Sequence, residues 1–351
     1  MSLIPVTILT GFLGSGKTTL LKRILTEAHG QKIAVIENEF GEENIDSDIL
    51  VSDTTENIIQ MSNGCVCCTI RDDLRVTLQD LAEKKRKGEI TFDRVVIETT
   101  GLADPGPVAQ TFFMDEEIAE QYLLDSILTL VDAKHAQTQL NERLEARRQI
   151  GFADQIFISK SDLVAKDEVD ALMHRIKHMN PRAPQKTVHF GEVAIADVFD
   201  LRGFNLNAKL DIDPDFLTYD HHHDTSPADA DNLGPFLGQD KPQGKPHKHH
   251  VHDDDVKSFV FKSDKYFDAA KLEDFLGAIV NIYGPRMLRY KGVLNMKGTE
   301  RKVIFQGVHQ LMGSDLGPIW AKGEKRGSKM VFIGINLPKD IFLQGMEQCL
   351  V

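Results

Sequence analysis

The segment GFLGSGKT, at residues 11–18, constrains the fold of this chain more than any other feature. It matches the phosphate-loop pattern G-x4-G-K-[ST]. An apolar run at residues 3–9 precedes it, and residues 17–27 carry apolar side chains at helical spacing. Glycines let the backbone approach phosphates closely, and the start of a helix favours anions. The sequence therefore predicts a P-loop nucleotide-binding domain.

The residues of this loop have distinct expected roles. Lys17 should reach the β- and γ-phosphates, and Thr18 should place its hydroxyl on Mg²⁺. Lys17 is also one of two residues expected to act in catalysis, because phosphoryl transfer depends mainly on positioning and charge stabilisation. The other loop residues predicted to contact the nucleotide are Gly11, Gly14, Ser15, Gly16 and Thr19.

Further apolar runs alternate with helical stretches up to about residue 210. The runs expected to be strands are residues 32–38, 94–99, 126–133 and 155–160, and residues 72–85 look helical. Strands that alternate with helices predict an α/β domain with a parallel sheet covered on both faces.

Two of these strand ends carry chemistry suited to a nucleotide. Glu98 begins ETTG and is the second expected catalytic residue, a carboxylate on the Mg²⁺ side with Gly101 near the γ-phosphate. Asp162 could accept two hydrogen bonds from guanine, and the stem of Lys160 could cover the base. The usual guanine motif has Asn where this chain has Ser159. The alternatives are a surface carboxylate that caps a strand and a solvated pair of loop charges.

Three of the four cysteines gather in NGCVCC, as Cys65, Cys67 and Cys68. Thiolates are soft ligands suited to Zn²⁺ and similar ions, but two or three cannot close a tetrahedral site. Glu37 is the first candidate for a further ligand, and an open position would suit metal transfer. Buried apolar cysteines and a redox pair are alternatives, although C-x-C-C differs from the thioredoxin-type C-x-x-C.

Residues 213–255 have few apolar side chains and many Gly, Pro and Asp, and we expect a flexible linker there. The segment also holds histidines, whose neutral imidazoles could collect Zn²⁺, Ni²⁺ or Co²⁺ without a fixed geometry. A solvated linker with no metal role is the alternative. The candidate accessory ligands are His221, His222, His223, His247, His249, His250 and His252.

Regular patterns return at Val256. Expected strands at 256–262, 287–296, 301–312 and 329–337, with helices at 268–280 and 340–350, predict a small α+β domain of the split-βαβ kind. The predicted organisation is therefore a nucleotide-binding domain at 1–212, a linker at 213–255 and a second domain at 256–351.

Charge and hydropathy narrow the class of protein. The net charge of −12 argues against a nucleic-acid-binding protein and against adhesion to anionic membranes. No apolar run reaches the roughly 18 residues that a membrane span requires. The N-terminal residues also lack the basic and apolar regions of a signal peptide, so we expect a cytoplasmic protein.

GFLGSGKT, VIENEFGE, NGCVCC and ETTGLADPGPV together resemble the CobW-type metallochaperone GTPases, nearest to a bacterial branch of that family. The resemblance implies a P-loop GTPase domain followed by a CobW C-terminal domain, with zinc, cobalt or a related metal as cargo. It also implies that Cys65, Cys67 and Cys68 are the metal motif.

The resulting hypothesis is a GTPase that binds GTP or GDP, Mg²⁺ and Zn²⁺ (or Co²⁺ or Ni²⁺) and hands the metal to a client metalloprotein. Leu102 stands where Ras-like enzymes carry a water-orienting Gln, so slow intrinsic turnover is expected. The chain is expected to be a monomer or an oligomer that depends on nucleotide or metal. The alternatives are a metal store or sensor that uses GTP structurally, and an ATP-dependent kinase.

Overall fold

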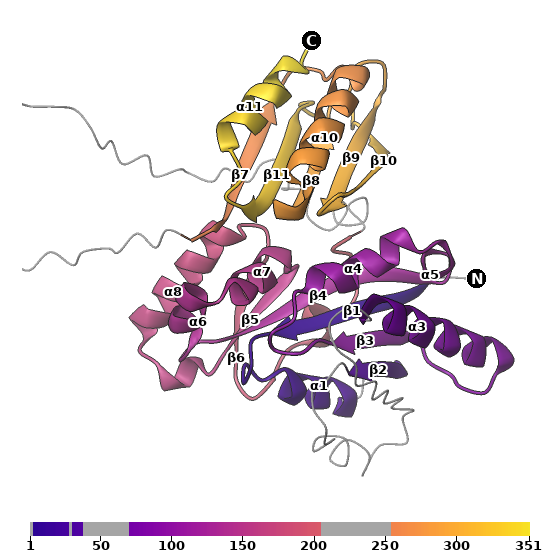
Figure 1. Ribbon diagram of the computed structural model, residues 1–351, viewed down its shortest axis with the longest axis vertical. Helices are drawn as coiled ribbons and strands as arrows, with labels where there is room; N and C mark the ends of the chain where they lie inside the picture. Colours follow the sequence, from indigo (N-terminus) through magenta and orange to yellow (C-terminus); the bar gives the residue numbers. More distant parts are fainter. Residues whose placement is uncertain (1–2, 28–29, 38–69, 205–253) are drawn as a thin grey trace, which may run out of the picture.

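The computed structural model describes residues 3–27, 30–37, 70–204 and 254–351, which form two sheets with their helices (Figure 1). The expected cysteine motif and the seven histidines of the expected linker lie outside the described residues. The linker prediction at 213–255 lies outside them too, apart from its last two aspartates.

The first sheet has six strands, and all of its pairs are parallel, as the alternating pattern predicted. In order across the sheet they are β2 (Ile33–Glu37), β3 (Arg94–Glu98), β1 (Ile4–Gly11), β4 (Tyr122–Asp132), β5 (Gln155–Ser159) and β6 (Gln185–Val188). β6 was not predicted, because its sequence QKTV is mostly solvent-accessible and lacks an apolar pattern.

Helices cover both faces of this sheet. They are α1 (Lys17–Thr26), α3 (Ile70–Lys87), α4 (Pro105–Met114), α5 (Glu116–Ala119), α6 (Ala136–Glu142), α7 (Leu144–Phe152) and α8 (Lys166–Met179), with short 3-10 turns η1 (Ser161–Leu163) and η2 (Ile195–Asp197). Successive strand side chains point to opposite faces. Val95 therefore belongs to the apolar cluster under α3, α4 and α7, while Val96 belongs to the cluster under α1.

The second sheet has five strands, each antiparallel to its neighbours. Its order is β10 (Leu311–Ile319), β9 (Arg301–Val308), β8 (Met287–Leu294), β11 (Ser328–Ile335) and β7 (Val256–Ser263), with helices α10 (Ala269–Tyr283) and α11 (Lys339–Gln348) and the 3-10 turn η4 (Gly284–Arg286). β7 and β8 are both antiparallel to β11, so they run parallel to each other with β11 between them. This is the expected split-βαβ arrangement.

One expected strand of this sheet was wrong. Residues 301–312 form two strands, β9 and the start of β10, joined by a turn at His309 and Gln310. The turn contains no Gly, Pro, Asn or Asp, which are the residues that usually mark a hairpin. The apolar pattern therefore predicted one continuous strand over residues 301–312, because no typical turn residue stands at His309 or Gln310.

The second sheet is covered on both faces. α10 and α11 pack on one face, around Phe332 and Phe342. The other face joins the core of the first domain, where α7 and α8 contact β7 and β8 (Figure 1). A Cβ on Gly151 of α7 would lie 2.6 Å from the Leu288 side chain, so the glycine is needed for this close approach. The two domains thus share one apolar core.

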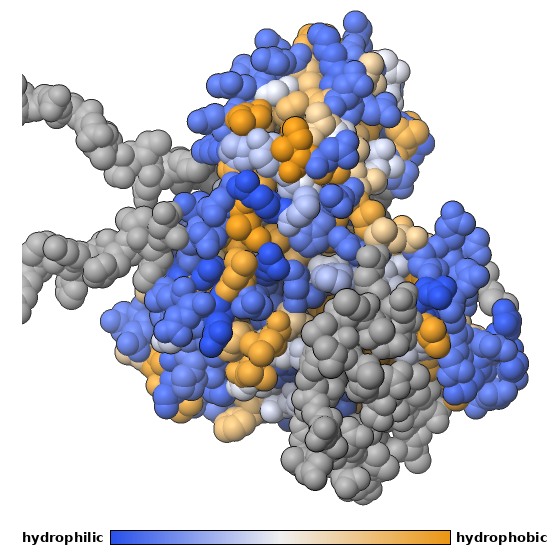
Figure 2. Space-filling view, viewed as in Figure 1, coloured by the Kyte–Doolittle hydropathy of each residue, from blue (hydrophilic) through white to orange (hydrophobic). Residues whose placement is uncertain are grey.

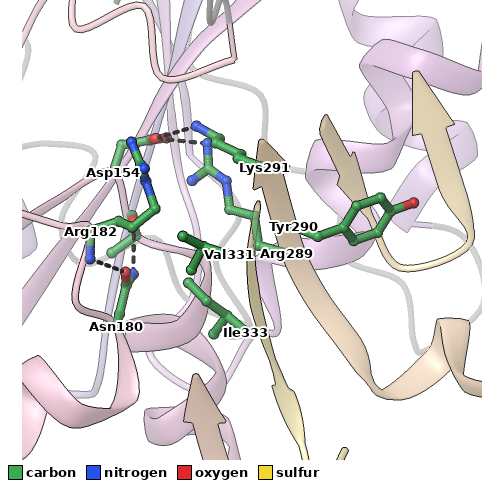
Figure 3. Close-up of a pocket in the computed structure, with 9 residues that line it drawn as sticks. Asp154, Asn180, Arg182, Arg289, Tyr290, Lys291, Val331 and Ile333 are labelled. Atoms are coloured by element: carbon green, nitrogen blue, oxygen red, sulfur yellow. Dashed lines mark hydrogen bonds and ion pairs between the residues drawn. The ribbon is translucent and has the colours of Figure 1, made fainter. Parts of the chain in front are cut away.

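Buried charges cross the same interface (Figure 3). Asp154, two residues after the end of α7, pairs with Arg289 at 2.7 Å and with Lys291 at 3.2 Å, both from β8. Asn180 donates to Ile150 O at 2.8 Å and to Ala153 O at 2.9 Å, which fixes the end of α7. Two cations on one buried carboxylate tie the position of β8 to that of α7.

Candidate functional site

The phosphate loop lies between β1 and α1, as predicted. Gly11, Gly14 and Gly16 have φ values of 144°, 73° and 98°, which L side chains rarely adopt. A Cβ on Gly11 would also lie 2.4 Å from Leu130 O of the neighbouring strand. The loop therefore requires glycine at these turns, and its backbone is free to approach a ligand.

Lys17 is held inside this loop. Its Nζ donates to Gly11 O at 2.9 Å, and the residue is only 8% exposed. Burial lowers the pKa of Lys17, while the nearby charge of Glu98 acts in the opposite direction. A cation beside the N-terminus of α1 suits phosphate oxygens.

Thr18 and Glu98 lie 80 positions apart in the sequence, yet the Thr18 hydroxyl donates to Glu98 Oε1 at 3.2 Å. Strand pairing brings them together, because Leu9 of β1 is in register with Glu98 of β3. A hydroxyl and a carboxylate are oxygen ligands of the kind that Mg²⁺ prefers, so this donor pair fits the ion.

The candidate metal ligand Glu37 lies on the next strand. β2 pairs with β3 in parallel, and Glu37 is in register with Glu98. Both residues end their strands, so their side chains start from neighbouring positions at the carboxyl edge of the sheet. Glu37, a predicted transition-metal ligand, and Glu98, a predicted Mg²⁺ ligand, therefore share this edge.

The end of β5 contacts the phosphate loop from the other side. The Ser159 hydroxyl donates to Ser15 O at 2.7 Å, and Lys160 Nζ donates to Gly14 O at 2.8 Å. Lys160 adopts a left-handed conformation with φ 55°, and it also pairs with the buried Asp132 at 2.8 Å. Burial would raise the pKa of Asp132, but hydrogen bonds from Lys160 and His135 outweigh it and lower the pKa.

Asp162 lies in η1, two residues beyond Lys160, and its side chain is 47% exposed. Its Oδ1 is 3.4 Å from His189 Nδ1, so the residue after β6 contributes to this corner. Ser159, Asp132 and His189 were not predicted to act here, because they become neighbours only through the pairing of β4, β5 and β6.

The loop after β3 contacts the phosphate loop directly. A Cβ on Gly101 would lie 2.5 Å from Leu13 N, so only glycine fits there. Gln149 of α7 donates to Gly101 O at 3.1 Å and to Ala103 O at 3.0 Å. Asp104 then caps α4 by accepting from Gly106 N at 2.9 Å. Sequence reasoning missed Gln149, since nothing in an amphipathic helix indicates such a distant partner.

Of the predicted transition-metal ligands, only Glu37 is among the described residues. Within the described ranges, no group of three or more His, Cys, Asp or Glu side chains could hold a metal ion. Cys349 is buried in the second domain, where burial raises the pKa of its thiol. Cys65, Cys67, Cys68 and the histidines remain predictions.

A family model for the nucleotide-binding domain of CobW, HypB and UreG matches residues 5–187. The chain belongs to this family. A second model, for the C-terminal domain of the cobalamin synthesis protein CobW, matches residues 256–350. The family resemblance inferred from the motifs is therefore confirmed in both halves of the chain.

Two curated relatives span nearly the full length. The zinc chaperone YjiA of Escherichia coli K12 is 40% identical over 342 residues, covering 97% of this chain and 96% of the relative. The zinc chaperone CobW of a Sinorhizobium species is 28% identical over 361 residues, covering 95% and 93%. Proximity to the bacterial branch typified by YjiA is thus also confirmed.

The crystal structure of the Zn(II)-bound YjiA GTPase from E. coli aligns over 100% of both chains, with a TM-score of 0.74 and 36% sequence identity. The predicted fold, a P-loop GTPase domain followed by a CobW C-terminal domain, is confirmed. So is the predicted enzyme class, a GTPase.

None of the described helices is both long and apolar enough to cross a membrane. Figure 2 shows that the visible face is mostly hydrophilic over both domains, with apolar residues in smaller groups.

Proposed function

We propose that this protein is a cytoplasmic zinc-delivering GTPase, in which the bound nucleotide controls a metal site made by Cys65, Cys67, Cys68 and Glu37. The observation that carries the proposal is the register of β2 and β3. Glu37, the candidate ligand for zinc, is the direct strand neighbour of Glu98, the candidate carboxylate for Mg²⁺.

This register supports coupling by a short route. Thr18 donates to Glu98, and Glu98 neighbours Glu37, so a change at the phosphates can reach the metal ligand across two adjacent strands. Bound Mg²⁺ would neutralise charge on the phosphates. Thr18 and Glu98 are the described residues that would hold it.

The loop from Gly101 to Asp104 provides a second sensor of the phosphates. It contacts Leu13 of the phosphate loop and is held from behind by Gln149. Leu102 is 52% exposed and, being aliphatic, cannot orient an attacking water. The slow turnover that Leu102 predicts for the isolated protein would fit a GTPase that waits for metal or a client before hydrolysis.

Both full-length relatives are named as zinc chaperones, and this supports zinc as the cargo and a metalloprotein as the client. Co²⁺ or Ni²⁺ could bind the same ligands, but thiolates are more typical ligands of zinc. The seven histidines would act as an accessory collector of metal. The second candidate, a metal store or sensor with structural GTP, predicts a zinc affinity that does not depend on the nucleotide.

The test is a zinc titration of the chain lacking residues 220–252, with Mg²⁺ and either GDP or a non-hydrolysable GTP analogue. We expect the triphosphate form to bind zinc several-fold more tightly, since coupling between two sites is typically about 1–3 kcal/mol. Glu37→Gln should weaken zinc binding and reduce the difference between the nucleotide states. Glu89→Gln, an exposed glutamate after α3, is the matched control.

Equal zinc affinity in the GDP and triphosphate forms would contradict the delivery mechanism and favour the store. A normal nucleotide effect in Glu37→Gln would remove Glu37 from the proposed site while leaving the cysteines in place.

A further inference from the structure

The turn between β9 and β10 places a histidine where a hairpin usually has glycine. His309 is the first of two turn residues, and its φ of 53° lies in the left-handed region. Hairpin turns of this length favour Gly or Asn at such a position because a Cβ is strained there. Backbone strain of this kind persists where the surrounding contacts hold the residue in place.

The contacts that hold the His309 ring come from the other domain. Its ring meets the Phe152 ring edge-on, with centroids 5.3 Å apart. A Cβ added to Gly106 would lie only 2.6 Å from His309 Nε2, so the ring sits against the first turn of α4. The backbone N–H of His309 donates to Met287 O at 2.9 Å, which anchors the turn to β8. The hairpin of the second domain thus reaches the start of α4.

That start of α4 directly follows the 101–104 loop. Asp104 accepts from Gly106 N at 2.9 Å and from Arg148 Nη1 at 2.9 Å. The charges that face His309 are those of Asp104 and Arg148, with the Gly284 and Pro285 backbone also close. Gly106 and Asp104 are therefore held between His309 on one side and α7 on the other.

The same helix holds the rest of the loop. Gln149, next to Arg148, donates to the carbonyls of Gly101 and Ala103, and Gly101 touches the phosphate loop at Leu13. The contacts therefore run without interruption from the hairpin to the residues that would face the γ-phosphate. A shift of the hairpin toward α4 would press on Gly106 and its neighbour Asp104, because the gap between Gly106 and the His309 ring would not hold even a Cβ.

We propose that His309 is a positioning residue for GTP hydrolysis, through which the second domain sets the geometry of the 101–104 loop. It does not touch the nucleotide. It acts through Gly106 and Asp104, and the nucleotide in turn biases the β9–β10 hairpin, since coupling between two sites is reciprocal. The proposal concerns hydrolysis and requires no transition metal, so it stands or fails independently of zinc delivery.

The test uses the full chain and the variant His309→Gly, which removes the ring and relieves the strained turn at once. We expect kcat for GTP hydrolysis to fall by about five-fold, as for a residue within a coupling network, with KM and GTP affinity nearly unchanged. Gln310→Ala, at the exposed neighbour in the same turn, is the matched control and should hydrolyse GTP normally.

Hydrogen exchange provides the readout that simple packing would not move. In the unmodified chain, amides of β9 and β10 should exchange at different rates with GDP and with a non-hydrolysable GTP analogue. His309→Gly should abolish this difference. If that variant does not fold, His309→Asn serves instead, because Asn tolerates a left-handed backbone but is too short to reach Gly106.

The proposal is overturned if the folded variants keep a normal kcat. It is also overturned if kcat falls while the nucleotide-dependent exchange of the hairpin persists, because His309 would then act only through stability. Exchange that is identical in both nucleotide states of the unmodified chain overturns it directly.

Discussion

Ser159 shows how a single substitution in a motif can keep the local structure. The hydroxyl donates to Ser15 O at 2.7 Å and lies 3.4 Å from Val131 O, so the residue still ties β5 to the phosphate loop. The guanine contact is expected from Asp162, whose carboxylate is exposed three residues further on. With Ser in place of Asn at position 159 the loop therefore keeps this support, and the expected selection of guanine rests on Asp162.

At this scale we predict that Asp162→Asn weakens the preference for GTP over ATP. The loss should be about 2–3 kcal/mol, or roughly 30- to 150-fold, because a charged acceptor for guanine donors is removed. Competition of each nucleotide against a fluorescent GDP analogue measures it. Asp170→Asn, an exposed aspartate of α8, should leave the preference unchanged. Equal competition by GTP and ATP in the unmodified chain would contradict the assigned role.

At the scale of elements, sequence and structure agree wherever a pattern is local. Continuous apolar runs such as β1 and β3 predicted parallel strands because both faces are buried, and the glycine spacing predicted the phosphate loop. The missed features depend on partners far away in the chain. β6 is an edge strand without an apolar pattern, and the turn at His309 is held by Gly106 and Phe152 of the other domain.

In the candidate site, too, residues that belong to a local motif could be predicted, and residues with distant partners could not. The positions of Lys17 and Thr18 at the start of α1 were predictable because they follow from the loop pattern itself, while their roles stay predictions. Gln149 was not, because its partners Gly101 and Ala103 lie 48 and 46 positions away. Glu37 was chosen for its chemistry, but only strand register places it beside Glu98.

We predict that removal of residues 220–252 lowers the number of zinc ions bound per chain and leaves GTP hydrolysis intact. The segment holds seven histidines, and none of the described contacts of the phosphate loop depends on it. Equilibrium dialysis gives the metal count, and phosphate release gives the rate. An unchanged count would support a linker without a metal role, whereas a lost rate would place part of this segment in the nucleotide site.

For the whole molecule, the buried carboxylate of Asp154 is a direct link between the domains. It pairs with Arg289 and Lys291, and its second oxygen accepts from Ile127 N at 3.0 Å. A second pair, Arg175 with Asp254 at 2.6 Å, joins α8 to the residue two positions before β7. The side chains of these pairs are at most 10% exposed, so solvent screens them little.

We predict that Asp154→Ala destabilises the chain by about 3–5 kcal/mol, because two cations lose their buried partner. Urea unfolding followed by circular dichroism measures the change. Asp264→Ala, whose carboxylate pairs with Lys325 at the surface, should cost less than about 1 kcal/mol. A loss of similar size in both variants would mean that the buried pairs do not hold the domains together.

The shared core also has a consequence for how the protein is made. The ribosome completes the first sheet and α7 before β8 and β11 exist, so Gly151 and Phe152 must wait for the rest of the chain to cover them. Apolar surface left open in this way promotes aggregation of nascent chains. Chains that stop early should therefore be recognised by cellular quality control, and half-length expression products should be recovered mainly as insoluble material.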